Sequence, residues 1–276
     1  MILVTGAAGQ LGADVMSELR QRGIGSMGID IAELDITDAG AVRHFMRKHA
    51  PSCIIHCAAY TAVDRAEDEP ELCIRVNAEG AGNIAESCRE TGAEIVYIST
   101  DYVFSGDGDA PYETDAPRAP LQVYGKSKLA GEEAVKLNVE KHYIVRTSWV
   151  FGHNGNNFVK TMLDLAKTRN EIRVVNDQVG SPTYSPDLAT LICDVALSGK
   201  YGIYHATNEG FCSWAEFAKE IMRQSGKLCN IEPISSEQYP TKAVRPKNSR
   251  MSKESLDRAG LNRLPKWEIA LSRYLS

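Results

Sequence analysis

The sequence predicts an α/β protein: a doubly wound parallel sheet covered by helices, with a smaller lobe formed by the C-terminal half. Three observations support this fold class. Apolar strand-like runs alternate with helical stretches through the first 150 residues, a glycine-rich turn joins the first strand to the first helix, and the alternation stops after residue 150. Alternating strands and helices build parallel sheets, because the crossover helices pack on the faces of the sheet.

Five strands and four helices are expected in the first part of the chain. The strands occupy residues 2–5, 26–30, 53–58, 94–99 and 142–150. The helices occupy residues 11–22, 38–49, 70–91 and 124–139. Pro70 suits the first turn of the third helix and Gly92 suits its end. Residues 105–120 repeat glycine, aspartate, alanine and proline, and we expect them to form a loop.

The second half, residues 151–276, is expected to form mainly the smaller lobe, with some segments returning to the first domain. It contains a helix over 158–168, a strand over 202–206, a helix over 213–225 and a terminal helix over 266–275. Ser213 is expected to cap its helix, because a serine oxygen accepts a hydrogen bond from the first helical turn. No internal repeat or long linker separates independent domains.

Composition excludes several classes of function. The 276 residues carry 31 Lys and Arg against 36 Asp and Glu, a formal charge of -5, with no basic block to neutralise a nucleic acid. No apolar run approaches the ~20 residues of a membrane span. The chain opens directly with a strand, and none of its seven cysteines forms a C-x-x-C pair. We therefore expect a cytoplasmic protein with buried free thiols.

A glycine-rich loop follows the first strand at residues 6–12, with sequence GAAGQLG. Gly6, Gly9 and Gly12 have the spacing that turns a strand sharply into a helix, so that the backbone there, including Gln10 and Leu11, can receive a pyrophosphate. In a chain with 22 glycines the same spacing also fits an ordinary helix entry. Its place between a strand and an amphipathic helix favours a dinucleotide-binding domain over residues 1–150.

Asp30, at the end of the second strand, is expected to select the cofactor. Its carboxylate suits a ribose 2′-hydroxyl and would repel a 2′-phosphate, which favours NADH over NADPH. The neighbouring Asp35 and Ile36 fit either the edge of an adenine or a surface turn.

Two further segments suit the approach of a cofactor. Ala58, Ala59 and Tyr60 end the third strand with small residues, which leave room for a ligand or for a packed helix. Asn77 lies within the helix over 70–91. It is either a solvated helix residue or an anchor for the loop or a water chain that helps to place Lys128.

Tyr124 and Lys128 lie one helical turn apart on the same face of a helix. A nearby ammonium favours the phenolate, so we expect the pKa of the tyrosine to fall from about 10 toward neutrality and the phenol to exchange protons. Thr100 follows the strand over 94–99 and points at the same crevice, where its hydroxyl would hold a carbonyl oxygen. A lone threonine there would suggest packing, but its combination with the other two elements favours the site.

These elements, in this order, resemble the extended short-chain dehydrogenase/reductase family, which has a Rossmann fold. The resemblance runs from residue 1 to about residue 275, and its late motifs are more specific than the glycine loop. It is carried by residues 99–104 (STDYVF), 124–132 (YGKSKLAGE), 146–150 (RTSWV), 155–158 (GNNF), 176–183 (NDQVGSPT) and 245–251 (RPKNSRM). Within the family the chain is most similar to reductases of dTDP-4-keto-6-deoxy sugars.

The resemblance implies hydride transfer from NADPH or NADH to C4 of the keto sugar. Tyr124 would supply the proton, Lys128 would bind the nicotinamide ribose, and Thr100 would orient the carbonyl. Trp149 would stack on the sugar, and two arginines would pair with the diphosphate unless their segment is a solvated basic loop. The substrate-binding residues implied are Thr100, Asp101, Tyr102, Trp149, Asn157, Gln178, Arg245 and Arg250.

Relatives on the same scaffold suggest alternatives. A 4,6-dehydratase is disfavoured, because Asp101 is followed by Tyr102 where dehydratases carry glutamate. A nucleotide-sugar epimerase needs the same tyrosine and lysine and stays open. A non-catalytic subunit, like the one that regulates methionine adenosyltransferase, is disfavoured because Thr100, Tyr124 and Lys128 are all present.

Some reductases of this group dimerise through a metal that acidic residues of both chains hold. Only Asp14 matches such a position, and no C-terminal extension follows Ser276 to supply another carboxylate. We therefore expect no metal, and a monomer in preference to a homodimer.

Overall fold

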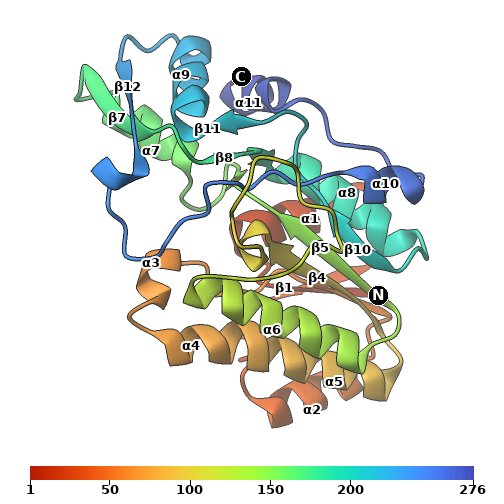
Figure 1. Cartoon of the computed structure of the whole chain (residues 1–276). Coiled ribbons are helices and arrows are strands. Elements are labelled where there is room, and N and C mark those ends of the chain that lie inside the picture. The colour runs from red at the N-terminus through yellow and green to blue at the C-terminus, as the bar shows by residue number, and fades with distance from the viewer.

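A six-stranded parallel sheet forms the centre of the molecule, as predicted (Figure 1). The computed structural model describes residues 1–276. The strand order is β2-β1-β3-β4-β5-β10, and all neighbours are parallel. The strands are β1 (Ile2–Thr5), β2 (Ser26–Ile29), β3 (Cys53–His56), β4 (Glu94–Thr100), β5 (His142–Thr147) and β10 (Gly202–His205). The winding reverses between β1 and β3, which is where doubly wound sheets bind ligands at their carboxyl ends.

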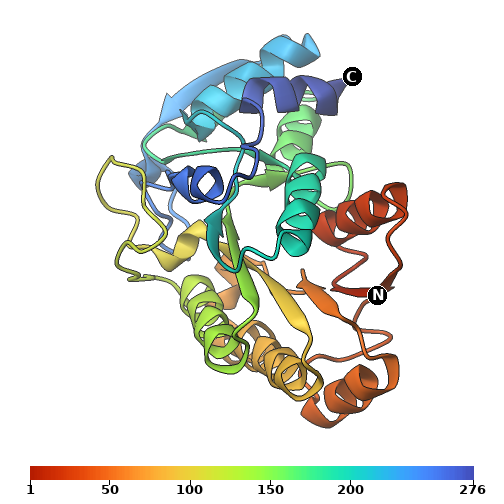
Figure 2. The ribbon, with the colours of Figure 1, turned by 90° about the vertical axis from the view of Figure 1, so that its right-hand side faces the viewer.

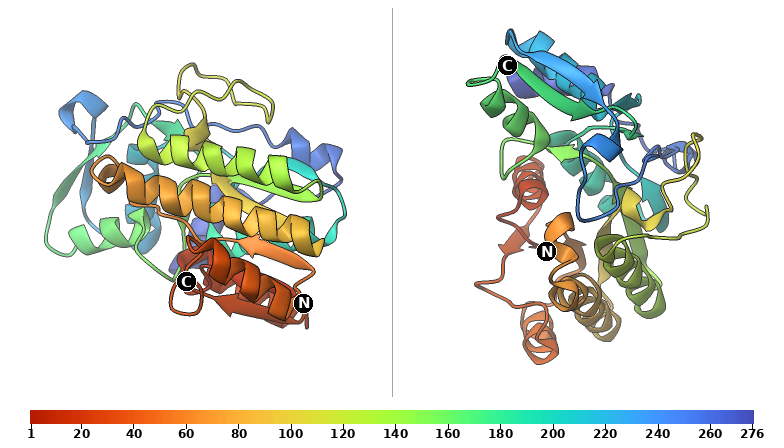
Figure 3. Two further views of the ribbon diagram at one scale, coloured as in Figure 1. Left: turned by 90° about the horizontal axis from the view of Figure 1, so that it is seen from below. Right: turned by 60° about the vertical axis from the view of Figure 1, so that its left-hand side comes forward.

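Helices cover both faces of the sheet. The view from below in Figure 3 shows α2 (Ala39–His49), α5 (Ala81–Thr91) and α6 (Val123–Asn138) side by side on one face. On the other face α1 (Gln10–Gln21) packs against α8 (Ser185–Leu197), visible in Figure 2. Alternate side chains of each strand enter the two apolar cores, so all six of these central residues are buried: Leu3, Ile54 and Ile95 on the first face, and Val4, Ile55 and Val96 on the second.

The helix predicted over residues 70–91 is continuous but not uniform. It comprises α4 (Pro70–Ile74), a π-helical turn η1 (Arg75–Gly80) and α5. The short α3 (Val63–Ala66) precedes it, and the 3₁₀ turn η2 (Asp101–Val103) follows β4. Wide π turns inside α-helices are frequent at functional sites, and this one contains Asn77.

The C-terminal lobe lies beyond the carboxyl ends of the sheet (Figure 1) and has its own apolar core. Three small strand pairs build it: β6 (Val150–Phe151) with β9 (Thr183–Tyr184), β7 (Glu171–Val175) with β12 (Asn230–Ile234), and β8 (Val179–Gly180) with β11 (Cys212–Ser213). Its helical elements are α7 (Phe158–Leu165), α9 (Trp214–Ser225), η3 (Ser236–Gln238), α10 (Glu254–Arg258) and α11 (Trp267–Leu275). The predicted cap is confirmed, because Ser213 forms a capping box with Glu216.

Several predicted boundaries were wrong. The strand over 142–150 divides into β5 and β6, because Trp149 adopts a left-handed φ of 49° that interrupts the extended chain. The strand over 53–58 ends at His56, and the helix over 158–168 ends at Leu165. Three elements of the second half, α8, β10 and α10, pack with the main sheet, so residues after 150 contribute to both parts of the molecule.

All seven cysteines are free thiols, and six of them are buried. No helix is both long enough and apolar enough to cross a membrane.

Candidate active site

The glycine loop is built as a cradle for an anion. Gly6 has a left-handed φ of 65°, and a Cβ on Gly12 would lie 2.0 Å from the Gly6 carbonyl oxygen, so neither position accepts a side chain. No side chain caps α1, and the backbone N–H groups of Gln10, Leu11 and Gly12 have no partner in the protein. These free donors at a helix N-terminus suit a pyrophosphate.

A cavity opens beside this loop, at the carboxyl ends of β1, β2 and β3. Asp30 lies on it with its carboxylate held by the backbone N–H groups of Ala8 (2.9 Å) and Ile31 (3.2 Å). No lysine or arginine lines the cavity. The residues predicted to bind the cofactor that do line it are Gly6, Gly9, Asp30, Asp35, Ile36, Ala58 and Ala59.

Asn77 anchors the end of β3 to the helix that carries the tyrosine. Its Oδ1 accepts from the Tyr60 backbone N–H (2.8 Å), and its Nδ2 donates to the Tyr60 carbonyl (3.0 Å) and to Ser127 Oγ (3.0 Å). Asn77 is buried, so the alternative of a solvated helix residue was wrong. The Tyr60 hydroxyl donates to Glu69, at the start of α4.

The helix α6 brings Tyr124 and Lys128 to the end of β4. Two glycines allow the close approach: a Cβ on Gly125 would lie 2.2 Å from the Tyr102 carbonyl oxygen, and one on Gly131 would lie 2.1 Å from the Tyr97 hydroxyl. Lys128 is 2 % exposed, and its Nζ lies 4.1 Å from the centre of the Tyr97 ring without a hydrogen bond or ion pair. Its ammonium is thus left free for a ligand.

Burial dominates the titration of this pair. It lowers the pKa of Lys128 to about 7, against the opposing charge of Glu132, and it raises the pKa of Tyr124 above that of a free phenol. The expected fall of the tyrosine pKa is therefore wrong for the protein alone, because burial of the phenolate is the largest influence on this pKa and raises it. Burial also keeps His56, beneath Lys128, neutral with its pKa lowered to about 3.

Thr100 and Asp101 lie next to the phenol. The Thr100 hydroxyl donates to Asp101 Oδ1 at 3.0 Å, and it lies close enough to the Tyr124 phenol to lower the pKa of that group against the larger effect of burial. Asp101 is buried, and burial raises the pKa of its carboxyl to about 6, although hydrogen bonds from Ser249 and Thr100 act in the opposite direction. The ring of Tyr102 meets that of Tyr124 edge to face at 5.5 Å. Thus three of the predicted residues, Thr100, Asp101 and Tyr102, surround the phenol.

The C-terminal half contributes a cation next to Tyr102 and a pair of stacked tryptophans. Arg245 donates to the Tyr102 hydroxyl (3.1 Å) and forms an ion pair with Asp64 in α3 (2.5 Å). Trp149 stacks on Trp214, with ring centres 3.6 Å apart. Arg245 thus reaches Tyr102, whose ring contacts that of Tyr124 on α6.

Three other predicted substrate residues lie differently. Arg250 donates to Asn248, and Gln178 is buried. Both amide hydrogens of Asn157 are used by the protein, donated to Gln10 Oε1 (3.0 Å) and the Gly152 carbonyl (2.8 Å), while its oxygen caps α7. Asn157 therefore links α1 to the lobe, and Gln10 completes the link by donating to the Val150 carbonyl.

A family model described as the RmlD substrate binding domain matches residues 1–276. The chain belongs to this family. It is 44 % identical to the spore coat polysaccharide biosynthesis protein SpsK of Bacillus subtilis, over 99 % of this chain and 96 % of that protein. It is 42 % identical to a dTDP-4-dehydrorhamnose reductase of Streptomyces griseus, over 98 % and 91 %. The predicted family resemblance is thus confirmed.

A solved structure supports the same assignment. The dTDP-4-dehydrorhamnose reductase of Bacillus anthracis, determined in complex with NADP, superposes with a TM-score of 0.96 at 45 % identity, covering 99 % of this chain and 97 % of that one. The fold class predicted from the sequence, a parallel doubly wound sheet of the Rossmann type, is confirmed.

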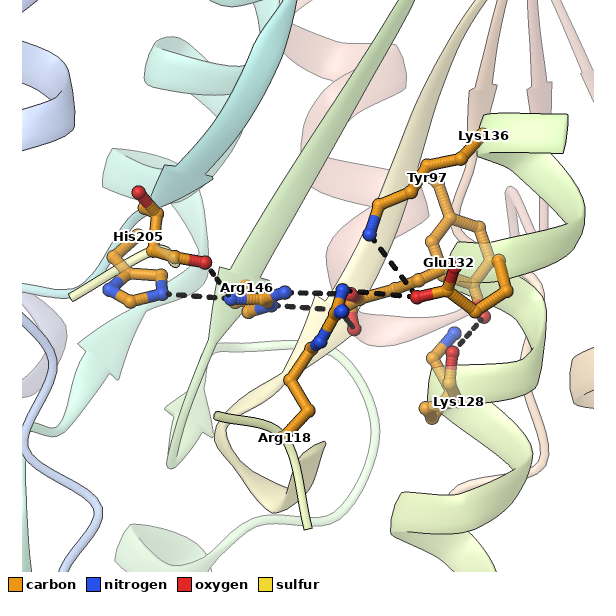
Figure 4. A network of polar contacts seen from close by, with 10 residues as sticks. Tyr97, Arg118, Lys128, Glu132, Lys136, Arg146 and His205 are labelled. Atoms are coloured by element: carbon orange, nitrogen blue, oxygen red, sulfur yellow. Dashed lines mark hydrogen bonds and ion pairs between the residues drawn. The ribbon is translucent and has the colours of Figure 1, made fainter. Parts of the chain in front are cut away.

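Behind the RmlD-family catalytic helix lies a buried ion pair that the sequence analysis missed. Glu132 accepts from Arg146 Nε at 2.8 Å and Nη2 at 2.7 Å, and both side chains are fully buried. Ser99, the residue before Thr100, donates to the same carboxylate at 2.5 Å. Figure 4 shows Arg146 reaching from Glu132 on α6 to His205 on β10.

Sequence signals for these missed residues were uneven. Glu132 follows Lys128 by four residues, so the spacing that paired Tyr124 with Lys128 also places it on the same face of α6. Arg146 is a charge within an otherwise apolar strand, which indicates a buried partner. Nothing local marked Asp64 or Trp214, because their contacts are made with residues more than sixty positions away.

Asp14, the position matched to a metal ligand, is engaged within the chain. Its carboxylate accepts a hydrogen bond from the Ser185 hydroxyl at the start of α8, and burial raises its pKa. The structure gathers no group of three His, Cys, Asp or Glu side chains that would hold a metal ion. The absence of a metal stays a prediction.

Proposed function

We propose that this chain reduces the C4 keto group of dTDP-4-dehydro-L-rhamnose to give dTDP-L-rhamnose, with NADPH or NADH as the reductant. The observation that carries the proposal is the position of Tyr124 and Lys128 one turn apart on α6, with Thr100 next to the phenol and Lys128 near Cys57, which lines the cavity at the switch point of the sheet. The chain is similar over nearly its whole length to dTDP-4-dehydrorhamnose reductases, and this similarity supports the substrate class.

The residues present fit a dinucleotide. The free N–H groups at the start of α1 suit its pyrophosphate, Asp30 suits the adenosine ribose, and the small residues Ala58 and Ala59 leave room near the nicotinamide. When bound, the reduced nicotinamide supplies the hydride. Lys128, whose Nζ has no partner in the protein, is placed to bind the ribose beside it.

Tyr124 is the proton donor in this proposal. Because burial keeps its phenol neutral, it holds a proton at working pH and can release it to the alkoxide oxygen that develops at C4. The positive charge of Lys128 stabilises the phenolate that remains. Thr100 orients the carbonyl oxygen, and its hydroxyl already contacts the phenol.

The substrate is held from the C-terminal half. Trp149 offers a ring face or edge to the sugar. Arg245 pairs with the diphosphate; it contacts Tyr102, whose ring contacts that of Tyr124. Asp101, Tyr102, Gln178 and Arg250 complete the proposed pocket. Asn157 acts at one remove, by holding the lobe against α1.

We further infer a cytoplasmic monomer. Free thiols at all seven cysteines suit a reducing compartment. Asp14 already receives a hydrogen bond from Ser185 in the same chain, which argues against its sharing a metal with a second copy.

The test is the loss of absorbance at 340 nm when the protein is mixed with NADPH or NADH and dTDP-4-keto-L-rhamnose, with the product identified by NMR. We expect one cofactor oxidised for each dTDP-L-rhamnose formed. An epimerase would interconvert sugars without net cofactor oxidation. Tight nucleotide binding with no conversion of the keto sugar would favour a regulatory subunit.

A further inference from the structure

Asp101 is buried at the end of β4 with an incomplete set of partners. Its Oδ1 accepts from the Thr100 hydroxyl at 3.0 Å. Its Oδ2 is buried without any partner. A buried carboxylate normally has its oxygens satisfied, so this environment favours the neutral carboxyl form.

The Thr100 hydroxyl has a single hydrogen to give. In the observed geometry that hydrogen is donated to Asp101, while Thr100 Oγ1 accepts from the Tyr102 backbone N–H at 3.3 Å. An ionised Asp101 can only accept, and it therefore holds the hydrogen away from the catalytic cavity. A neutral Asp101 can donate to Thr100 Oγ1, which reverses the bond and frees the threonine hydrogen.

We propose that Asp101 is a positioning residue whose protonation releases the Thr100 hydrogen toward the substrate carbonyl and the phenol of Tyr124. The inference rests on the proposed function and concerns a residue that regulates a hydrogen-bond donor in the same site. No proton leaves Asp101 in the step: Tyr124 gives its proton to the substrate oxygen, and Thr100 only donates a hydrogen bond to that oxygen. A preorganised donor of this kind is worth about 10²–10³ in kcat.

The surroundings of Asp101 give the direction of the pH effect. Burial raises the pKa of its carboxyl to about 6, and the titratable groups facing it are Tyr124 from α6 and Tyr102 from η2, whose hydroxyl accepts from Arg245. A bound sugar would exclude more water and raise the pKa further. Reduction is therefore fastest at low pH and falls as pH rises through this pKa.

The first experiment compares pH profiles of kcat. In the wild type, kcat falls about tenfold for each pH unit above the midpoint, since only the neutral form is productive. Asp101→Asn offers a permanent amide donor to Thr100, so the fall disappears and kcat at pH 8 exceeds that of the wild type. Ser249→Ala removes a nearby hydroxyl that lowers the pKa of Asp101, so the fall moves to higher pH.

Asp109→Asn, a change of the same charge in the exposed loop, should leave the profile as it is. The proposal is overturned if Asp101→Asn keeps the wild-type fall, or if a folded Asp101→Asn that still binds dTDP loses turnover. Absence of any fall in the wild type also overturns it. Failure of the proposed function is distinct, because the wild type would then oxidise no cofactor with the keto sugar.

A second measurement needs no turnover. The carboxyl carbon of Asp101, followed by ¹³C NMR, should titrate near pH 6 in the wild type and at higher pH in Thr100→Val, because the hydrogen bond from Thr100 stabilises the carboxylate. Identical midpoints in the two proteins would mean that no hydrogen bond is available to reverse, and would overturn the proposal.

Discussion

Tyr124 is held on the first turn of α6 by contacts on several sides. Its ring meets Tyr102 edge to face, and its hydroxyl contacts Thr100. Burial is the largest influence on its pKa and keeps the phenol neutral, as the proposed role of proton donor requires. Lys128 is the complementary group: a buried ammonium that an anion nearby would stabilise.

Replacing Tyr124 by phenylalanine removes only the proton donor. We expect Tyr124→Phe to lower kcat by about 10²–10⁴, the range that general acids contribute. The aromatic contact with Tyr102 is kept, so the Kd values for dTDP and NADH should stay within about twofold of the wild type. A tenfold change in Kd would correspond to about 1.4 kcal/mol. Absorbance at 340 nm measures kcat, and calorimetry measures the binding of dTDP and NADH. An equal loss of binding would contradict the assigned role.

A second prediction at the scale of single residues concerns Asp30 and the choice of cofactor. A 2′-phosphate would place about two negative charges beside this carboxylate in a cavity without a lysine or arginine. We expect both cofactors to work and Asp30→Asn to raise the kcat/KM ratio of NADPH to NADH about tenfold, equivalent to ~1.4 kcal/mol of relieved repulsion. Steady-state kinetics with each cofactor measure this ratio. An unchanged ratio would place the 2′ position away from Asp30.

At the scale of elements, the Glu132–Arg146 pair ties α6 to β4, β5 and β10. Arg146 also donates to the Thr114 carbonyl at 2.9 Å, in the loop that precedes Tyr124. His205 in turn contacts the Ser252 carbonyl in the C-terminal half. The pair thus fixes the catalytic helix against the strands and loop around it.

Glu132→Gln leaves a buried guanidinium without its counter-charge. Breaking one side of a buried pair costs about 3–5 kcal/mol, so the free energy of unfolding should fall by that amount. Urea unfolding of the variant measures it. The double replacement Glu132→Gln with Arg146→Met removes the unpaired charge and should recover part of the loss. A loss of less than about 1 kcal/mol in the single variant, the size of an exposed pair, would contradict this assignment.

The elements that the sequence predicted share a local signal. The glycine loop, the alternating strands and the Ser213 cap are short-range features, and the structure contains each of them. β7, β12 and α8 were not predicted because they lack a clear local signal. Two five-residue strands pair across more than fifty positions, and α8 is apolar on most sides because it is buried between α1 and the sheet.

The candidate site divides in the same way. Thr100, Tyr124 and Lys128 follow from spacing and from strand ends: α6 carries both Tyr124 and Lys128, and Thr100 lies next to the phenol. Asp64 and Trp214 depend on how the two halves of the molecule meet, which no local pattern contains. The fall expected in the tyrosine pKa failed because spacing predicts a neighbour but not the cost of burying a phenolate.

At the scale of the whole molecule, a strap joins the C-terminal lobe to the catalytic helix. The strap comprises residues 239–251, which lie between β12 and α10 in the chain, and it runs past α3 (Figure 1). Asp64 accepts from the Ala243 backbone N–H at 3.1 Å and pairs with Arg245 at 2.5 Å, while Lys242 pairs with Asp68. Next to these, Glu67 accepts from the Val123 backbone N–H at the start of α6 (2.8 Å), so the same segment holds both strap and helix.

Asp64 already forms an ion pair with Arg245, the cation that the proposed function assigns to the diphosphate. A diphosphate approaching Arg245 meets the repulsion of this carboxylate and competes with it, so Asp64→Asn should tighten dTDP binding. We expect Kd to fall about threefold to tenfold, within the range of a partly exposed ion pair, and the gain to shrink as salt is added. Calorimetry with dTDP measures it, and Asp68→Asn, which loosens the strap without touching Arg245, is the matched control. Weaker binding in Asp64→Asn would show instead that Asp64 orients Arg245 for the diphosphate, and would reverse the assigned direction of the coupling between the two halves.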